Sequence, residues 1–269
     1  RYSPDSFGVQ EADKNWIALL GEAMPDYNYF GTYRDDGISE GESNNIFYKK
    51  DKYELVNSGD FWLSETPDVP SMGWDAACYR ICTWAVLENK ETKEKFVHVN
   101  THLDHVGVLA RRNGVELMLE HLKNYNDIPA VFTADMNILE GEENYLQFVN
   151  SGFMYDTKYQ APNTVNYLTY HDVHPSEQEK SIIDYVMIND KFSADYLNRF
   201  AAGDFVHNFL DCFFGRNGGS FKNGNFYDFS CNKSFVDVAD YGFGNAFFAN
   251  SYNYGNSVCK RAKISALFG

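Results

Sequence analysis

The sequence predicts an α/β or α+β protein in which helices pack outside β-sheets, and three observations lead to this fold class. Short apolar runs of strand type recur over residues 1–199, only two segments have helical apolar spacing, and the chain has no internal repeat. A chain of 269 residues with 44% hydrophobic residues can bury a sizeable core. We therefore expect one large domain or two small ones, and not a disordered chain.

The predicted elements alternate along the chain. Residues 13–24 have helical spacing and stop at Pro25, and residues 108–125 carry an apolar stripe at the same spacing. The predicted strands are Ser6–Val9, Tyr27–Tyr33, Asn45–Tyr48, Tyr53–Trp62, Cys78–Leu87, Phe96–Asn100, Ala130–Thr133, Val165–Tyr170 and Ile182–Ile188. Many strands with few helices are typical of sheets covered by outer helices.

A change in composition near residue 200 divides the chain. Residues 201–269 hold six basic and five acidic residues, 12 of the 22 Phe, and nine each of Asn and Gly. The preceding part carries 17 basic and 33 acidic residues. We therefore expect a domain over 1–199 and an atypical Phe/Asn/Gly-rich segment over 200–269.

Charge and hydropathy limit the classes of partner. The net charge of −15 disfavours unassisted docking on nucleic acid, although a bound divalent cation reverses that effect locally. The apolar runs are far shorter than the roughly 20 residues of a membrane span. We expect a soluble protein, cytoplasmic or exported with its leader removed, and infer no protein partner. The five cysteines form an odd, sparse set, which predicts core or free thiols.

Residues able to carry chemistry follow the predicted strands. Glu11, His102, Asp135 and Asn137 each stand at a strand end, where α/β proteins usually place their sites. Asp184 lies inside an apolar run, where a carboxylate is costly unless it is paired or bound to a metal. Oxygen-rich ligands without a thiolate cluster favour a hard ion, Mg²⁺ or Mn²⁺.

Each of these residues also has a structural interpretation. A single acidic residue at a strand end is more often a turn or cap residue than a ligand. Four other histidines are expected to be surface or hydrogen-bonded structural residues: His98, His121, His171 and His174.

The ordered set of segments is more specific than any one of them. The segments are Phe7-Gly-Val-Gln-Glu11, Gly31-Thr-Tyr-Arg-Asp-Asp-Gly37, Gly41-Glu42, Ile46-Phe-Tyr48, Phe61-Trp-Leu-Ser-Glu-Thr-Pro67, Gly73-Trp-Asp-Ala76, Arg80, Asn100-Thr-His-Leu-Asp-His105, Ala110-Arg111, Thr133-Ala-Asp-Met-Asn137 and Ile183-Asp-Tyr185. Over residues 1–199 the chain resembles the endonuclease/exonuclease/phosphatase family, which has the deoxyribonuclease I-like fold. The resemblance is greatest to a bacterial-type branch of metal-dependent hydrolases.

The resemblance implies a fold and a reaction. The fold is a four-layer sandwich of two mixed β-sheets flanked by helices. The reaction is cleavage of a phosphoester bond by an activated water, with Mg²⁺, or Mn²⁺, as the cofactor.

The resemblance also implies a role for each matching residue. Glu11 would ligate the metal, and Asp135 would ligate it and orient or activate the water. Asn137 would bind the phosphate or the metal beside it. His102 would contact the scissile phosphate, and Glu42 would orient the His102 imidazole.

Two further roles depend on partners. By the same resemblance, Asp184 would orient a second histidine. Arg80 would bind the substrate phosphate, because a guanidinium holds a phosphate bidentately. The alternative for Arg80 is an ion pair with a carboxylate such as Asp75.

The chain departs from the family at both ends. It has no Ser-Asp-His segment, and the only histidine after Asp184 is His207, in an unrelated context. It also begins too late to include the family's first strand. We expect both strands to be missing and stability to be reduced. The segment over 200–269 is then either a shifted-frame read-through or a divergent native extension.

These observations lead to ranked functions. The first is a Mg²⁺-dependent phosphoesterase acting on a phosphodiester or phosphomonoester of a small or soluble molecule, with a nuclease of the same family as the alternative. The second is a catalytically impaired remnant that binds only metal or a phosphorylated ligand, because the terminal Asp-His pair is absent. A structural or adhesive role of the tail ranks last.

Overall fold

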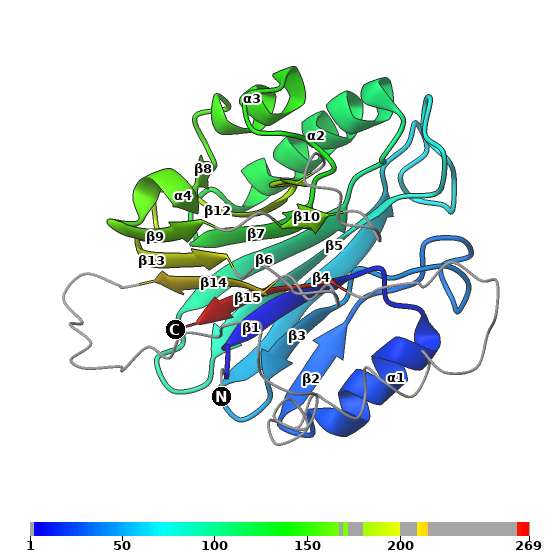
Figure 1. Ribbon diagram of the computed structural model, residues 1–269. Helices are drawn as coiled ribbons and strands as arrows, with labels where there is room; N and C mark the ends of the chain where they lie inside the picture. The colour runs from blue at the N-terminus through cyan, green and yellow to red at the C-terminus, as the bar shows by residue number, and fades with distance from the viewer. Residues whose placement is uncertain (1–2, 167–168, 172–179, 200–208, 215–262, 269) are drawn as a thin grey trace.

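Two mixed β-sheets packed face to face form the centre of the molecule, with helices on the outer faces (Figure 1). The computed structural model describes residues 3–166, 169–171, 180–199, 209–214 and 263–268. One helix covers the first sheet and the other main helices cover the second. The predicted α/β class is confirmed, and the layers follow the predicted order of helix, sheet, sheet and helix.

The first sheet has the strand order β2-β3-β1-β15-β14-β13-β9. Its strands are β1 (Ser6–Gln10), β2 (Tyr27–Phe30), β3 (Ile46–Lys49), β9 (Asn163–Asn166), β13 (Ala194–Arg199), β14 (Phe209–Phe214) and β15 (Lys263–Phe268). β1 pairs antiparallel with β3 on one side and with β15 on the other. Because β1 lies in the interior of the sheet, all five of its residues are buried.

The composition-biased segment contributes two of these strands. β15 runs antiparallel to β1, with Ser6 opposite Leu267 and Gln10 opposite Lys263, and β14 runs parallel to β15. The β1 backbone groups facing β15 are therefore paired, and the expected loss of stability stays a prediction. The division at residue 200 and the absence of two family strands stay predictions.

The second sheet has the strand order β4-β5-β6-β7-β12-β8. Its strands are β4 (Tyr53–Trp62), β5 (Ile81–Asn89), β6 (Lys95–His102), β7 (Ala130–Asp135), β8 (Tyr155–Asp156) and β12 (Asp184–Ile188). β6 and β7 are parallel and α2 connects them, whereas the other pairs are antiparallel. A separate hairpin-like pair joins β10 (Tyr170–His171) to β11 (Lys180–Ser181). The predicted run Val165–Tyr170 is thus divided between two sheets.

Both predicted helices are present. α1 (Lys14–Ala23) begins after Asp13, whose side chain accepts hydrogen bonds from the N–H groups of Asn15 and Trp16. α2 (Val108–Leu122) continues into the 3₁₀ helix η1 (Lys123–Tyr125). The shorter helices α3 (Glu143–Val149) and α4 (Thr157–Gln160) were not predicted. These helices are only one or two turns long, so their sequences are too short to show a clear apolar periodicity.

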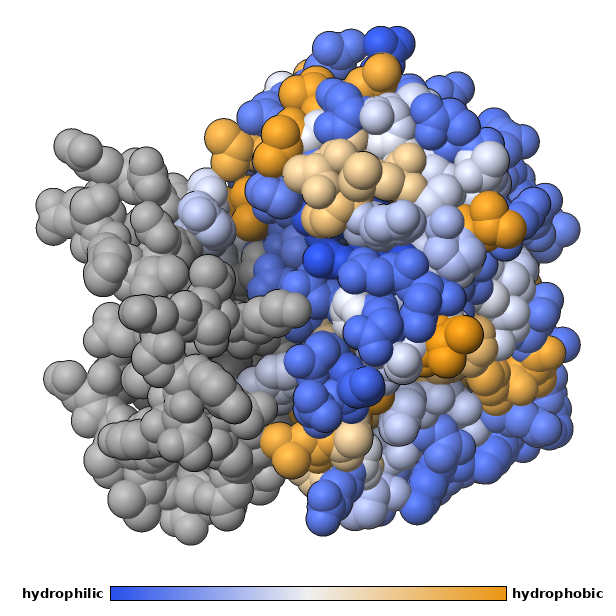
Figure 2. Space-filling model, turned by 90° about the vertical axis from the view of Figure 1, so that its right-hand side faces the viewer, coloured by the Kyte–Doolittle hydropathy of each residue, from blue (hydrophilic) through white to orange (hydrophobic). Residues whose placement is uncertain are grey.

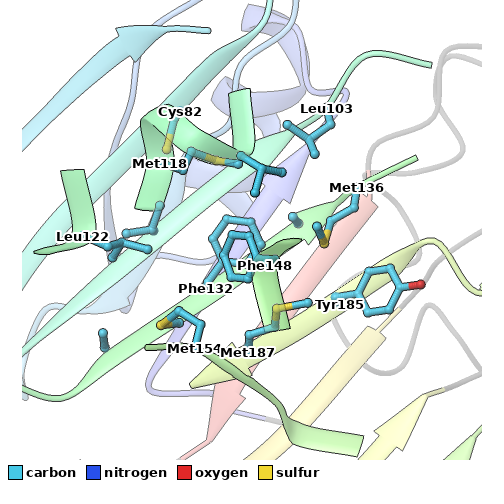
Figure 3. Close-up of a cluster of buried hydrophobic side chains, with 14 of the residues drawn as sticks. Cys82, Leu103, Met118, Leu122, Phe132, Met136, Phe148, Met154, Tyr185 and Met187 are labelled. Carbon is cyan, nitrogen blue, oxygen red and sulfur yellow. The ribbon is translucent and has the colours of Figure 1, made fainter. Parts of the chain in front are cut away.

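The core between the second sheet and its helices is aromatic and rich in methionine (Figure 3). Phe132 of β7 and Phe148 of α3 lie at its centre, with ring centroids 4.6 Å apart. Met118, Met154 and Met187 surround these rings, and all three are fully buried. This packing holds α2 and α3 against the strands that end at the candidate site.

The space between the two sheets includes a buried polar layer beside its apolar part. His98 on β6 is fully buried, with Nδ1 2.7 Å from the Ser6 hydroxyl and Nε2 2.9 Å from the Thr133 hydroxyl. The predicted structural role of His98 is therefore confirmed. Burial disfavours the imidazolium and lowers the pKa of His98 to about 3.

This depressed pKa predicts acid sensitivity. Between pH 6.5 and pH 3 the unfolded chain binds a proton at His98 that the folded chain does not, so stability falls as the pH falls. Urea unfolding at pH 7 and pH 5 should show a loss that is about 2 kcal/mol smaller in His98→Gln than in the unaltered chain. Equal losses in the two proteins would contradict a neutral buried His98.

The surface is mainly hydrophilic on the face shown in Figure 2, with several small hydrophobic groups among the polar residues. Within the described ranges, no helix is both long and apolar enough to cross a bilayer. Cys78 and Cys82 are free thiols, as the sparse cysteine set predicts.

Candidate functional site

Three strands from the two sheets end at the same place and carry the candidate residues there. Glu11 directly follows β1 in the first sheet, whereas His102 and Asp135 are the last residues of β6 and β7 in the second. His102 and Asp135 are partners in the parallel β6–β7 register. The strand ends therefore bring together residues that are far apart in the chain, as the sequence predicts for an α/β site.

The side chains of these three residues converge. One ligand atom each from Glu11, His102 and Asp135 lies within 4.8 Å of the others, and His102 Nε2 is 3.4 Å from Asp135 Oδ2. Asp135 is 1% exposed and His102 is 7% exposed. Two carboxylates and an imidazole nitrogen in a partly buried place make a donor set that attracts a cation.

Two residues of the site have an unusual backbone conformation. The φ angles are 60° at Glu11 and 48° at Asn137, both in the left-handed region that non-glycine residues seldom adopt. Such a conformation costs on the order of 1–3 kcal/mol. Asparagine tolerates this region, whereas local propensity does not select it for glutamate, so the surrounding structure holds Glu11 in this conformation where β1 ends.

Asn137 joins the two parallel strands through its side chain. Its Nδ2 donates to the carbonyl oxygen of Leu103 at 2.9 Å and lies 3.0 Å from His102 Nε2. Its backbone N–H donates to Asp135 Oδ1 at 3.1 Å. Because an amide nitrogen only donates, His102 Nε2 carries its lone pair in this arrangement. Asn137 thus orients both the imidazole and the carboxylate.

Asp184 lies next to this group. It is fully buried and stands directly opposite Asp135 in the antiparallel β7–β12 register. The backbone N–H groups of Ile183 and Asp184 both donate to the Thr169 hydroxyl, which fixes the start of β12. His207, the only later histidine, falls outside the described residues, so the predicted orientation of a second histidine by Asp184 stays a prediction.

Glu42 lies near the end of β1 but points to an arginine. Its Oε2 is 2.6 Å from Arg34 Nη1, and the following Ser43 donates its N–H to the Ala12 carbonyl oxygen. The loop is therefore attached beside Glu11. Since the Glu42 carboxylate pairs with Arg34 in the structure, its predicted role in orienting His102 stays a prediction.

Arg80 belongs to a second group of polar residues. Its Nε lies 3.4 Å from Asp104 Oδ2, and its Nη2 lies 3.2 Å from His105 Nδ1. Arg80 thus pairs with a carboxylate, as the alternative predicts, although the partner is Asp104. Asp75 instead accepts hydrogen bonds from the N–H groups of Leu109 and Ala110 at the start of α2.

Asp104 is held in its charged form. Burial opposes ionisation, but hydrogen bonds from the N–H groups of Gly107, Val106 and Ala77, together with the Arg80 charge, hold the pKa of Asp104 well below its usual range. Cys78, Asp104 and His105 have ligand-type atoms within 4.8 Å of one another, yet the Arg80 guanidinium already contacts the carboxylate and the imidazole. Arg80 is therefore the cation of this group.

Asp104 and His105 are not among the residues for which the sequence predicts a role. Both lie in the matching segment Asn100-Thr-His-Leu-Asp-His105, two and three positions after His102. This segment could have indicated both residues, because it matches the family. The periodicity of a strand does not predict the contacts of the loop that follows it.

Comparison with known proteins identifies the family. An endonuclease/exonuclease/phosphatase family protein from Bacteroides thetaiotaomicron is 37% identical, with 73% of each chain covered and a TM-score of 0.69. This chain belongs to the endonuclease/exonuclease/phosphatase family. A second solved member, a mannosyl-6-phosphatase of the same bacterium, is 35% identical over 74% of this chain and 78% of its own, with a TM-score of 0.67.

Two other findings complete the comparison. An uncharacterised protein of Acanthamoeba polyphaga mimivirus is 29% identical over 146 residues, and the chain spans about half of that relative, 53% of its length. No protein-family model matches the sequence. Membership of the endonuclease/exonuclease/phosphatase family places the chain among phosphoester hydrolases, which are typically metal-dependent.

Proposed function

We propose that this chain is a divalent-metal-dependent phosphoesterase that hydrolyses a phosphate ester of a small soluble molecule, with a sugar phosphate monoester as the first candidate. The convergence of Glu11, His102 and Asp135 at the ends of three strands carries the proposal. The similarity to a mannosyl-6-phosphatase supports a sugar phosphate. The net charge of −15 disfavours a long polyanion such as nucleic acid.

The donor set fits Mg²⁺ or Mn²⁺. Glu11 and Asp135 offer carboxylate oxygens, which are the ligands that these hard ions prefer. The group of Glu11, His102 and Asp135 contains no cysteine. The buried amide oxygen of Gln10, which precedes Glu11, has no hydrogen-bond partner among the described residues. When bound, such an ion offsets the phosphate charge and stabilises the leaving oxygen.

The side chains supply the remaining chemistry. Asp135 is placed to orient a water molecule and to accept its proton, because the carboxylate is buried and fixed by the Asn137 N–H. The His102 imidazole would hold a phosphate oxygen once Nε2 is protonated, and the Asn137 amide would hold a second oxygen when Nδ2 turns from His102 to the substrate. The Asp184 carboxylate opposite Asp135 adds negative charge that would favour cation binding.

A substrate panel tests this proposal. The chain should hydrolyse mannose 6-phosphate with Mg²⁺ or Mn²⁺, should lose that turnover in EDTA and should regain it when metal is restored. Bis(p-nitrophenyl) phosphate and a single-stranded oligonucleotide serve as the diester and nuclease arms. Glu11→Gln should reduce the rate by 10²-fold or more, whereas Glu91→Gln, an exposed turn residue, should leave it unchanged.

Each outcome decides between the functions. Faster turnover of the oligonucleotide would replace the phosphatase proposal with the nuclease alternative. Metal binding without turnover on any arm would identify the impaired remnant, which binds but does not catalyse. Turnover that persists in EDTA would contradict the metal-dependent mechanism.

A further inference from the structure

The three residues of the candidate site are not all held by one sheet. β6 and β7 are neighbours in the second sheet, so their hydrogen-bond ladder fixes His102 against Asp135. β1, which ends just before Glu11, belongs to the first sheet. Among the described residues no ladder connects the two sheets, and side chains between them therefore set the position of Glu11 relative to the other two residues.

One side chain between the sheets belongs to one of these strands and bonds to the other two. Asn100 of β6 is fully buried, and its Oδ1 accepts hydrogen bonds from Gln10 Nε2 at 2.5 Å and from the Thr133 hydroxyl at 2.9 Å. Its Nδ2 donates to the carbonyl oxygens of Val9 at 3.0 Å and Asn45 at 3.3 Å. The Asn100 amide is thus bonded to β1 twice and to β7 once.

Each bonded position lies close to a site residue. Gln10 directly precedes Glu11, and residues 100 and 133 lie two positions before His102 and Asp135. Because side chains alternate between the faces of a strand, residues two apart point to the same side of the sheet. The Asn100 amide therefore lies on the same face of the second sheet as His102 and Asp135, two residues before His102 along β6.

A glycine on β1 makes room for this contact. A Cβ at Gly8 would lie 2.3 Å from Asn100 Oδ1 and 2.4 Å from Thr133 Oγ1, far inside van der Waals contact. The bare Gly8 backbone allows β1 to approach β6 and β7 closely enough for direct side-chain to main-chain bonds. The spacing between the sheets is consequently short at this position.

We propose that Asn100 is a positioning residue that sets the separation of Glu11 from His102 and Asp135, and through it the affinity of the site for a divalent cation. Asn100 does not contact the substrate or the reacting atoms. It acts on the candidate site by fixing the end of β1 against the ends of β6 and β7. The metal-affinity part of this inference rests on the proposed function, whereas the spacing part does not.

The network also offers a matched control. Beyond Thr133 it continues through His98 to Ser6, at the opposite end of β1 from Glu11. Ser6→Ala and Asn100→Ala both remove a buried hydrogen-bonding side chain between the same sheets. Both should lower stability, since each leaves buried polar partners without a bond. Only the second removes a bond beside the candidate site.

The test measures metal binding and geometry together. Titration calorimetry with Mn²⁺ should show an affinity 10-fold or more weaker in Asn100→Ala and within 2-fold of the unaltered chain in Ser6→Ala. Metal-free crystal structures should show a wider separation of Glu11 from Asp135 only in Asn100→Ala. If Asn100→Ala does not fold, Gln10→Met, which removes the contact from β1 to Asn100 Oδ1, replaces it, and the Glu11–Asp135 separation is then the deciding readout because the Gln10 amide oxygen lies beside the site.

The outcomes separate the two proposals. An unchanged affinity and an unchanged Glu11–Asp135 separation in a folded Asn100→Ala or Gln10→Met variant would overturn the positioning role. An unaltered chain that binds no Mn²⁺ and hydrolyses no ester would overturn the proposed function. In that case the crystallographic separation alone decides the inference about Asn100.

Discussion

Replacing Asp135 with Asn should lower the rate of ester hydrolysis by about 10²–10⁴-fold, the range typical for loss of a catalytic acid or base. The exchange removes the charge that the cation and the attacking water need. It keeps Oδ1, which accepts the hydrogen bond from the Asn137 N–H, so the turn after β7 should stay in place. Initial rates at saturating Mg²⁺, measured against substrate concentration, give the effect.

The same variant should not lose stability. Asp135 and Asp184 stand opposite each other in the β7–β12 register, where like charges repel. Removing one charge relieves this repulsion, and the free energy of unfolding should be unchanged or higher. Asp127→Asn, at an exposed position beyond the η1 helix, is the control and should alter neither quantity. An Asp135→Asn variant that keeps a third of the original rate would remove Asp135 from the mechanism.

Adding one methyl group at Gly8 should destabilise the fold by more than about 3 kcal/mol. The new Cβ would overlap Asn100 and Thr133 at 2.3–2.4 Å. Overpacking of a buried site costs roughly 1–3 kcal/mol, and each buried polar group pushed from its partner adds about 1–3 kcal/mol. Urea unfolding of Gly8→Ala measures the loss, and the midpoint should fall well below that of the unaltered chain.

Gly114→Ala is the matched control for this variant. Gly114 is also buried, but it lies in α2 and an added Cβ would meet Leu63 Cδ1 at 3.4 Å, an ordinary contact. Since Ala favours a helix over Gly by about 1 kcal/mol, this change should be neutral or stabilising. Equal effects at the two glycines would show that the gap between the sheets at Gly8 is not tightly filled.

Several features of the fold could be predicted because they depend on local sequence. The apolar period of α1 and α2 and the stop at Pro25 determine where these helices lie. The runs that form β6 and β7 are short, apolar and followed by polar residues, which placed His102 and Asp135 at strand ends. The ordered segments also led to the endonuclease/exonuclease/phosphatase family, which the comparison with solved relatives shows.

Contacts made by loop residues could not be predicted in the same way. The pairing of Glu42 with Arg34 and of Arg80 with Asp104 depends on how loops fold and where they meet, and loops have no hydrophobic periodicity. The entry of β15 beside β1 depends on backbone hydrogen bonds between residues far apart in the chain. Composition indicated a change near residue 200 but did not indicate strands within the later segment.

The sequence by itself determined the fold class, the main helices and the residue types at the ends of β1, β6 and β7. These properties are local, since they follow from apolar spacing and from the chemistry of single side chains. Only the tertiary structure decided that Glu11, His102 and Asp135 converge, and that Asn100 and Gly8 bring β1 close to the second sheet. Convergence depends on the packing of two sheets against each other, and no single stretch of residues contains that information.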